Sequence, residues 1–559
     1  MANSSEALEP GQTGGLWQRM LRQLRPSHQH TAFSATLLLM TTVLLSRLIG
    51  YVRELYVAWT FGAGVQTDAF YAGFTIPDFL MYLVAGGATS ITFISIYTRF
   101  LTEDKQQDAH EAFSVVITVM TAILGAGVVL TEIFTPQITH WWFDKFNAEQ
   151  LRLCVHITRI ILPTQIFFYI GGVLSAVLYS RRLFLLPSLG PILYNAFIIA
   201  GGVLLSRRIG ASSLAYGALA GAFFGQFVLY AIGAARTGAR YRISFDVHNP
   251  AFREWVRLSV PLMLGLSLVT VDDWFIRRFA SGGIGEIARL SFAKKLFNVP
   301  IAILGQAVSQ ASLPFFARLF NEKRLQELTD IVNGAVYRTV AISLLATSFM
   351  TAAALPLIDL AYRHGSFNFS DSKETAVYFF WFSLSLVFWS AQGLYARAFY
   401  AAGNTLTPMV ASTLITIASY PMYAALYHKY SVVGLAIASD LGITANCLAM
   451  AILLNHRKLI PIAQLPWREL GKATITAVIA GILSFQMART VRITGSRVAD
   501  VRAVGLILVT WAGAVAAGLW ITRSKLLQEL RRRKGPIYPR VAERQPENPV
   551  GASNHSAKL

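Results

Sequence analysis

Apolar runs of about 20 residues recur along the chain from residue 33 to residue 522, separated by short polar or basic connections. An α-helix of this length crosses the hydrocarbon core of a bilayer. The pattern predicts fourteen such helices, at 33–58, 69–98, 111–135, 153–179, 185–205, 212–234, 256–279, 288–316, 333–361, 375–401, 407–428, 432–454, 470–489 and 502–522. The predicted fold class is an all-α polytopic membrane protein, with no soluble domain between the helices.

Composition agrees with this class, because 54% of the 559 residues are hydrophobic and only 14% are charged. A soluble protein carries about 25% charged residues.

The net charge of +20 would suggest a nucleic-acid partner in a soluble protein, but here the basic residues gather in alternate connections. Such a bias marks the cytoplasmic side of a membrane protein, so both termini are expected there and no nucleic acid is expected. The polar tails, 1–31 and 526–559, are expected to be disordered. The basic residues of this side are Arg19, Arg22, Arg25, Arg181, Arg182, Arg236, Arg240, Arg242, Arg457, Lys458, Arg531, Arg532, Arg533 and Lys534. The exceptions, on the opposite side, are Arg207, Arg208, Arg489, Arg492 and Arg497.

An internal repeat divides the chain. Segments 61–77 and 279–300 share a pattern, each after a charged helix, and each is later followed by an aromatic-x-Arg sequence that ends at Arg99 or Arg318. The spacing corresponds to about six helices, and two six-helix lobes around a central cavity are a known transporter plan. The predicted units are an N-terminal lobe at 32–245, a C-terminal lobe at 246–460, and two extra helices at 461–525.

Three residues are hinge candidates: Gly50 in the first helix, and Pro77 and Pro300 at matching positions of the repeat. Proline removes a backbone donor and bends or breaks a helix. The alternative is that membrane helices tolerate proline generally.

Arg47 and Arg53 lie inside the first apolar run. A charge at the centre of a bilayer costs at least a few kcal/mol, and such residues usually face a watery or protein-lined interior. Six residues of helix place the two arginines about 120° apart, lining a wide wedge. Lys294 and Lys295 provide cations in the second lobe. Basic groups that converge from both lobes predict an anionic substrate, such as a lipid diphosphate.

Four acidic residues are candidates for gating or coupling, and each has a structural alternative. Glu54 could form an interfacial pair with Arg53, and Asp68 could cap its own helix. Asp273, with Asp272, could form internal ion pairs with Arg277 and Arg278. Asp440 could bind a proton or cation, or be a buried acid bonded to a neighbouring helix. These alternatives stay open.

No nucleophile–base pair, metal-ligand cluster or phosphate loop occurs at a recognisable spacing. We therefore expect a transporter with no catalytic residues, metal or cofactor. Its driving force should come from an ion gradient, the membrane potential or coupling to metabolism.

An ordered series of motifs covers roughly residues 35–460. It comprises 45–54, 61–64, 67–70, 182–187, Pro191 with Asn195, Pro261 with Asp273 and 279–281, 305–309 with Pro314, 362–367, and 397–405 with Pro408. The series resembles that of the MurJ/MviN family, the lipid II flippases of the MOP exporter superfamily.

The resemblance implies a flippase for lipid II, the undecaprenyl-diphosphate-linked disaccharide pentapeptide of peptidoglycan biosynthesis. It would move lipid II from the cytoplasmic to the outer leaflet of the bacterial inner membrane by alternating access. The resemblance also implies that Arg47 and Arg53 are the functional arginines of the cavity and that Asp68 is the family's aspartate. Helices 13 and 14 would help to build a groove for the lipid tail. Membrane lipids and the cell-wall synthesis machinery are the implied partners.

The chain departs from the family at two places. The stretch 77–87, which contains Met81 and Tyr82, lacks the arginine and the glutamate that the family often has. In helix 8, Lys294, Lys295 and Asn298 replace an acid, an arginine and a glutamate. A flippase for another polyprenyl-diphosphate-linked oligosaccharide and a degenerate, non-transporting scaffold therefore remain alternatives. A drug antiporter would show acids rather than arginines at the cavity, and a glycosyltransferase would need catalytic acids near a loop.

Overall fold

The structure is a computed structural model, and it describes residues 32–85, 89–264, 267–491 and 496–531. These residues are almost entirely helical; one isolated bridge joins His364 to Phe367. The first helices are α2 (Ala32–Phe61), α3 (Val65–Gly73), α4 (Thr75–Ala85), α5 (Thr89–Thr102), α6 (Gln106–Trp142), α7 (Ala148–Ile161), α8 (Thr164–Ser180), α9 (Leu185–Ile209), α10 (Ser212–Gly221), the π-helix η1 (Ala222–Val228), α11 (Leu229–Arg236) and α12 (Pro250–Leu264). They are followed by α13 (Leu268–Ala280), α14 (Glu286–Pro300), the π-helix η2 (Ile301–Ala307), α15 (Val308–Asn321), α16 (Leu325–Ala352), α17 (Ala354–Tyr362), α18 (Phe369–Leu384), α19 (Leu386–Ala401), α20 (Leu406–Tyr430), α21 (Val433–His456), the short η3 (Ile462–Gln464), α22 (Trp467–Thr490), α23 (Arg497–Ile521) and α24 (Lys525–Arg531).

The all-helical membrane class is confirmed, but the count of fourteen spans is not. In the described part of the chain, ten helices are long and apolar enough to cross a membrane, or eleven if the bent pair α18–α19 is one span. Several predicted spans are divided into shorter helices: 69–98 becomes α3, α4 and α5, and 256–279 becomes α12 and α13.

Proline accounts for several of these divisions. Pro163 lies at the junction of α7 and α8, and Pro356 lies in the first turn of α17. Because proline cannot donate a backbone hydrogen bond and crowds the preceding turn, it favours the start of a new helix over the continuation of an old one.

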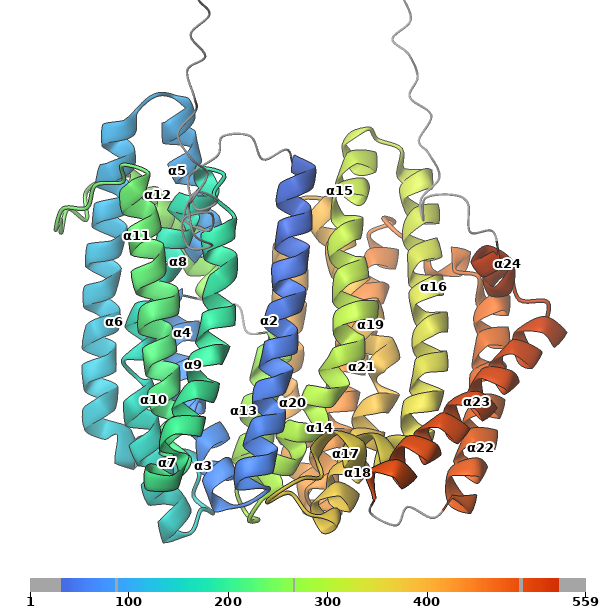
Figure 1. Cartoon of the computed structure of the whole chain (residues 1–559). Helices are drawn as coiled ribbons and strands as arrows, with labels where there is room; N and C mark the ends of the chain where they lie inside the picture. Colours follow the sequence, from blue (N-terminus) through green and yellow to red (C-terminus); the bar gives the residue numbers. More distant parts are fainter. Residues whose placement is uncertain (1–31, 86–88, 265–266, 492–495, 532–559) are drawn as a thin grey trace, which may run out of the picture.

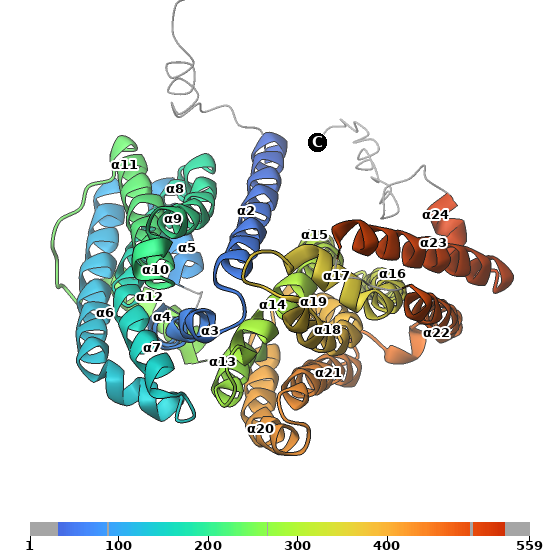
Figure 2. The same ribbon diagram turned by 60° about the horizontal axis from the view of Figure 1, so that its bottom comes forward.

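The helices form two groups, and α2 stands between them (Figures 1 and 2). The first group contains α3 to α12 and the second contains α13 to α23. The two halves of predicted helix 7 lie in different groups, because α12 packs against α4, α5 and α6, whereas α13 packs against α20 and α21.

The hydrophobic cores show how the groups meet. One core belongs to the first group and includes Phe113 and Tyr169, and another belongs to the second group and includes Phe316 and Tyr395. The largest core is shared, because it joins Phe70 and Ile157 of the first group to Phe292 of the second. The elements around this shared core, α3, α14, α17 and α18, lie at the lower end of Figure 1. In the described residues, the core that the two lobes share therefore lies at this lower end.

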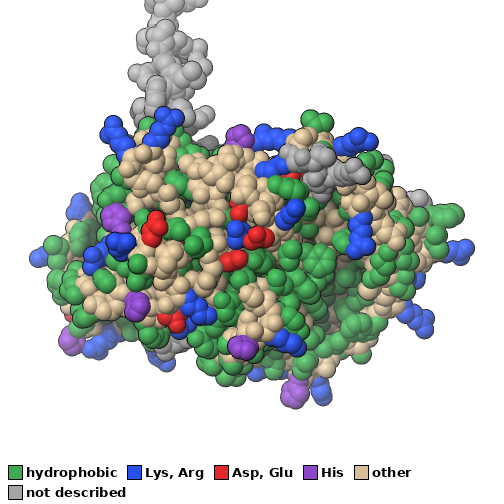
Figure 3. Space-filling view, turned by 90° about the horizontal axis from the view of Figure 1, so that it is seen from below, with side chains coloured by type: hydrophobic (Ala, Val, Ile, Leu, Met, Phe, Trp, Pro, Cys, Tyr) green, Lys and Arg blue, Asp and Glu red, His purple; other side chains and the backbone are tan. Residues whose placement is uncertain are grey.

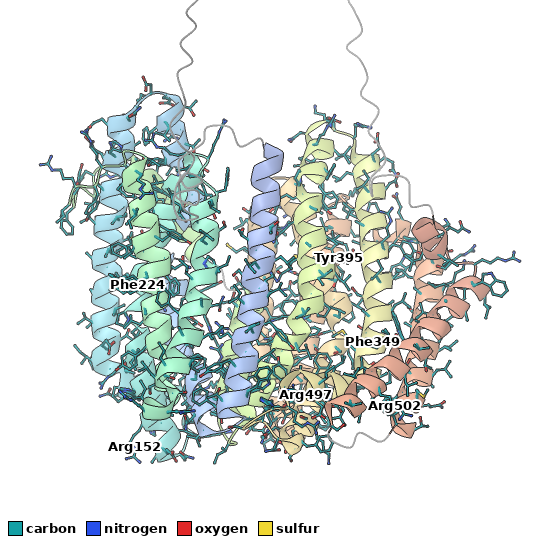
Figure 4. The ribbon with its side chains drawn as sticks, viewed as in Figure 1. Arg152, Phe224, Phe349, Tyr395, Arg497 and Arg502 are labelled. Carbon is teal, nitrogen blue, oxygen red and sulfur yellow. The ribbon has the colours of Figure 1, made fainter. Side chains whose placement is uncertain are left out.

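The start of α2 and the helix α24 both lie at the upper end (Figure 1). The connections α8–α9, α11–α12 and α21–α22, which carry many of the basic residues, lie at that end too. Arg152, Arg497 and Arg502 lie at the opposite end (Figure 4). The tail predicted to be disordered from residue 526 begins with α24 instead, while residues 1–31 and 532–559 lie outside the described part.

Candidate functional site: a charged cluster shared by the two lobes

The arginines of α2 contact both lobes. Arg47 is exposed, and its Nη2 donates a hydrogen bond of 2.6 Å to Oε1 of Gln306 in η2, across the boundary between the groups. The half-buried Arg53 donates from Nη1 to Oδ1 of Asn195 in α9 at 2.9 Å and forms an ion pair with Glu54. Glu54 is buried and also accepts a hydrogen bond from the Tyr71 hydroxyl. The predicted Arg53–Glu54 pair is therefore present, but it lies inside the protein.

The second lobe places Lys295 opposite these groups. Its ammonium is close enough to Glu54 of α2 and Asp78 of α4 to act on their charges, and also to Asp273 of its own lobe. Among the described residues Lys295 has no partner within ion-pair distance. Lys295 is therefore a cation that is available to a ligand.

Arg277 of α13 also crosses between the lobes. Its Nη1 lies 3.9 Å from Oδ2 of Asp78 and 3.3 Å from Oγ1 of Thr75, both in α4. Arg278 turns away and donates to the backbone oxygens of Trp141 and Trp142. The sequence suggested internal pairs between these arginines and Asp272–Asp273, whereas the structure gives Arg277 an ion-pair partner on the other lobe.

Lys294, next to Lys295, lies in a different environment. It is buried and forms ion pairs with Asp272 and Asp273 of α13. Asp272 also accepts hydrogen bonds from the Tyr423 hydroxyl of α20 and from the Ser439 hydroxyl of α21. This node joins four helices, and the partly exposed Asp273 connects it to the charged cluster.

Asp440 of α21 lies beside this node. It is close to Ser385 and within electrostatic reach of Asp272 and Lys294. Its Oδ1 is buried and has no hydrogen-bond partner among the described residues. Asp440 thus adds a third acid to a buried region whose nearest cation is Lys294.

Asp68 closes the lower end of the boundary. Its buried carboxylate accepts hydrogen bonds from the backbone N–H groups of Gly285 and Ala288 at the start of α14, the latter at 2.9 Å, and from Nε2 of Gln150 at 3.2 Å. Negative charge at a helix N-terminus is favourable, because the first N–H groups have no partner within the helix. The expected alternative, a cap on its own helix, is wrong: Gly64 is the N-cap of α3 and Asp68 caps a helix of the other lobe.

The backbone at this closure leaves no room for larger residues. Gly285 has a φ of +83°, and a Cβ at this position would lie 2.6 Å from the oxygen of Ala63 in the α2–α3 turn. Nearby, the backbone N–H of Ser366 donates to the oxygen of Trp59 at 2.8 Å, and its hydroxyl donates to the oxygen of Thr60 at 2.9 Å. Two loops of the second lobe therefore hold the end of α2.

Charged side chains also gather near the middle of this lower face (Figure 3). Around the start of α14, Arg289 forms ion pairs with Asp371 and Glu374 of α18, each at 3.0 Å, and with Glu286 at 3.4 Å. These pairs fix α14 against α18, so that Asp68 meets a rigid helix end.

The three hinge candidates occupy different settings. Gly50 lies within the continuous helix α2, where a Cβ would make only an ordinary contact with Asn195. Pro77 lies in the first turn of α4, just after the break from α3, and Pro300 ends α14 where the π-helix η2 begins. π-Helical turns are common at functional sites, and both prolines mark breaks in their spans. Hinge motion stays a prediction.

The sequence matches a known protein family over most of its length. The model of one family, described as lipid II flippase MurJ, matches residues 57–499, which is most of the chain. The chain belongs to the MurJ family. This is a family of membrane transporters rather than enzymes. The matched stretch starts after Arg47 and Arg53, so their assignment depends on the motif 45–54 and on the contacts described above.

Curated relatives extend over nearly the whole protein. The chain is 24% identical over 524 residues to the lipid II flippase MurJ of Burkholderia cenocepacia, a match that covers 90% of this chain and 99% of that protein. It is 24% identical over 418 residues to a probable lipid II flippase MurJ of Rickettsia prowazekii, covering 74% and 82%.

Solved structures share the fold. A structure of lipid II flippase MurJ in an inward closed conformation matches with a TM-score of 0.73 and 20% identity, covering 89% of this chain and 100% of that chain. An inward-facing MATE family transporter of the MOP superfamily matches with a TM-score of 0.60 and 14% identity, covering 74% and 94%. The chain therefore has the same two-lobed fold as these transporters.

Several residues of the cluster were not identified from sequence as contacts of the site. Gln306, Tyr71 and Asn195 hold the charged groups of α2, yet neutral polar residues of this kind are common in membrane helices. At the position where the resemblance expects an arginine, Tyr82 packs its ring against Trp274 of α13, as does Phe79. An aromatic wall therefore joins α4 to α13 beside the charged residues.

Proposed function

We propose that this MurJ family member flips lipid II from the cytoplasmic to the outer leaflet of the bacterial inner membrane by alternating access. The observation that carries the proposal is the cationic cluster contributed by both lobes: the exposed Arg47, Arg53 and the unpaired Lys295. A diphosphate requires several cations that can exchange their present partners for phosphate oxygens. Arg47 is hydrogen-bonded to the neutral amide of Gln306, and Lys295 has no ion-pair partner among the described residues. Both can therefore bind phosphate oxygens at little cost.

The two arginines suit the diphosphate because a guanidinium can grip two phosphate oxygens at once. Lys295 would add a point charge from the opposite lobe. Lys294 is already neutralised by two aspartates, so we assign it the role of holding α14 and thereby placing Lys295. Asp273 forms an ion pair with Lys294 and also lies at the charged cluster. The charge of a bound ligand would therefore affect Asp272, Lys294 and Asp440 through Asp273.

The packing at the lower end supports a state that is closed toward the outer leaflet. With both termini cytoplasmic, as the basic connections at the upper end favour, the Asp68–α14 cap and the Ser366 contacts lie on the outer side. Opening toward that side would separate Asp68 from the α14 N-terminus. Each charge-assisted hydrogen bond contributes about 1.5–3 kcal/mol, so the closure is substantial but reversible.

The lipid tail requires an apolar path. A cavity of about 540 Å³ lies among α16, α18 and α22, lined mainly by apolar residues and also by Arg489. Helix 13 of the prediction corresponds to α22, so the cavity supports half of the proposed groove; α23 contributes no lining residue among those described.

A second candidate function is the transport of another polyprenyl-diphosphate-linked oligosaccharide. The aromatic wall of Phe79, Tyr82 and Trp274 favours it, because it stands where the resemblance expects an arginine. Aromatic faces suit sugar rings, whereas the cations required for the diphosphate are the same for both substrates.

The test is complementation of a conditional flippase-depleted bacterium, with wild type and Arg47→Ala compared at equal expression. We expect rescue by the wild type and little or no rescue by Arg47→Ala, since a loss of about 1.4 kcal/mol already weakens binding of the diphosphate tenfold. Rescue by both chains would keep the function and exclude the role given to Arg47. A well-expressed wild type that does not rescue would favour the second substrate or a non-transporting scaffold.

A further inference from the structure

The connection between the two lobes, residues 237–249, lies outside the charged cluster. It runs between α11 and α12 around the outer side of α6, near the upper end of that helix (Figures 1 and 2). The backbone N–H of Arg242 donates to Ser114 Oγ at 3.1 Å, and the N–H of Ser244 donates to Thr118 Oγ1 at 3.3 Å. The connection is therefore fixed to α6 along one edge.

The connection carries several exposed apolar side chains. Tyr241, Ile243, Phe245 and Val247 are all exposed, with Ile243 at 70% and Phe245 at 64%. In an extended segment alternate side chains share a face, so Tyr241, Ile243 and Phe245 form one apolar row, which Val247 follows in a turn. The row is attached to α6 at Tyr241, because the Tyr241 ring packs on Phe113 and its hydroxyl lies 3.0 Å from Thr118 Oγ1.

The length of α6 indicates where this row lies relative to the bilayer. α6 has 37 residues, whereas about 20 suffice to cross the hydrocarbon core. Its exposed apolar residues run from Ile123 to Phe134, and Trp141 and Trp142 end the helix as interfacial residues do. The connection contacts α6 between Phe113 and Thr118, just above this lipid-facing stretch. By this count of residues, that level corresponds to the layer of lipid headgroups.

A cavity of about 790 Å³ lies between part of the connection and the start of α6. Its lining includes His110, Arg240 and Arg242, the acids Glu111 and Asp246, and also Tyr241, Ile243 and Phe245 of the apolar row. Arg181 and Arg240 both act electrostatically on His110, and its Nε2 is buried without a hydrogen-bond partner among the described residues. The cavity therefore offers several donors to an anion beside an apolar row.

We propose that residues 237–249 form an interfacial anchor that binds an anionic phospholipid. Ile243, Phe245 and Val247 enter the boundary between headgroups and acyl chains, and Arg240 and Arg242 bind the lipid phosphate. The leaflet is the one at the upper end of Figure 1, which is the cytoplasmic leaflet under the proposed orientation. The anchor would hold the first lobe at a fixed depth while the second lobe moves.

Depth in the bilayer tests the apolar row. A nitroxide is attached to the full chain at Phe245→Cys, in vesicles of phosphatidylglycerol and phosphatidylcholine, and its relaxation by oxygen and by a water-soluble nickel complex is compared. Val129→Cys, exposed on the middle of α6, is the lipid reference, and Asn321→Cys, at the end of α15, is the aqueous reference. The two native cysteines, Cys154 and Cys447, are buried and do not compete for the label.

We expect the label at 245 to favour oxygen over nickel, with a value closer to that at 129 than to that at 321. A value equal to that at 321 would overturn the proposal, because the row would then face water and be available to a protein partner. Neither result depends on which substrate the protein transports.

Retention of phospholipid tests the role of Arg240 and Arg242. Purified Arg240→Gln/Arg242→Gln is compared by native mass spectrometry with a matched control, Arg457→Gln/Lys458→Gln, which removes the same charge from the second lobe. We expect the first variant to bind phosphatidylglycerol roughly thirtyfold more weakly than wild type, from the contribution of two basic residues near a lipid surface. Equal retention by both variants would overturn the assignment of the phosphate site.

Discussion

At the scale of single residues, two neighbouring lysines have opposite roles. Lys294 is buried between Asp272 and Asp273, whereas Lys295 faces the charged cluster and has no ion-pair partner in the described part of the chain. The helix α14 turns by about 100° per residue, so adjacent side chains point to different neighbours. One lysine therefore stabilises the lobe, and the other is left for a ligand.

This contrast gives a prediction. Lys294→Met leaves two aspartates without their cation, and breaking a buried pair in this way costs about 3–5 kcal/mol. We expect a large fall in the thermal stability of the purified protein, whereas Lys295→Met should melt near the wild-type temperature and fail to complement. Thermal unfolding in detergent, combined with the complementation assay, checks both. Equal stability of the two variants would contradict the assignment.

At the scale of elements, the spans that carry the cluster are broken where the charges lie. α14 ends at Pro300 and continues as the π-helix η2, which carries Gln306, the partner of Arg47. The matching break between α3 and α4 is followed by Pro77. A break frees backbone groups and permits bending, so these two points are the natural places for a lobe to flex.

Pro300→Ala tests the hinge. Alanine restores the missing N–H and favours a continuous helix, so we expect slower flipping in proteoliposomes, by about tenfold if roughly 1.4 kcal/mol is added to the barrier. Stability should not fall. Pro421→Ala, within α20, is the control.

If both proline variants flip at the wild-type rate, Pro300 is a proline that the membrane merely tolerates. A loss shared by both would point to a general effect of removing prolines.

At the scale of the whole molecule, the core that the two lobes share in the described residues lies at the lower end. There, Asp68 caps α14, and the 363–368 loop grips the last turn of α2. Small interface movements in closely packed proteins tend to switch between discrete arrangements. Alternating access in this chain therefore requires the α2–α3 turn to separate from the loops that hold it.

A reversible crosslink tests this requirement. Thr60→Cys/Ser366→Cys places one thiol on each of the two segments that are joined by the 2.9 Å hydrogen bond from the Ser366 hydroxyl to the Thr60 backbone oxygen. We expect oxidation to abolish flipping in proteoliposomes and a reductant to restore it. The single-cysteine variants are the controls. Flipping that persists in the fully crosslinked protein would show that the outer closure stays shut during transport.

Sequence alone determined the membrane class, the charged helix α2 and the family, through hydrophobic period, side-chain chemistry and ordered motifs. These depend on residues near one another in the chain. The motif also identified Asp68 as significant, but local reasoning offered a cap on its own helix.

Only the tertiary structure decided which groups meet. Asp68 caps α14, and Lys294 rather than Lys295 forms the ion pairs with the two aspartates. Arg277 pairs with Asp78 of the other lobe, and α12 and α13 pack in different lobes. The physical reason is that ion pairs and caps between distant segments depend on how helices pack and rotate. A pattern along one helix shows that a charge is inside the membrane, but it does not show the helix that will lie opposite.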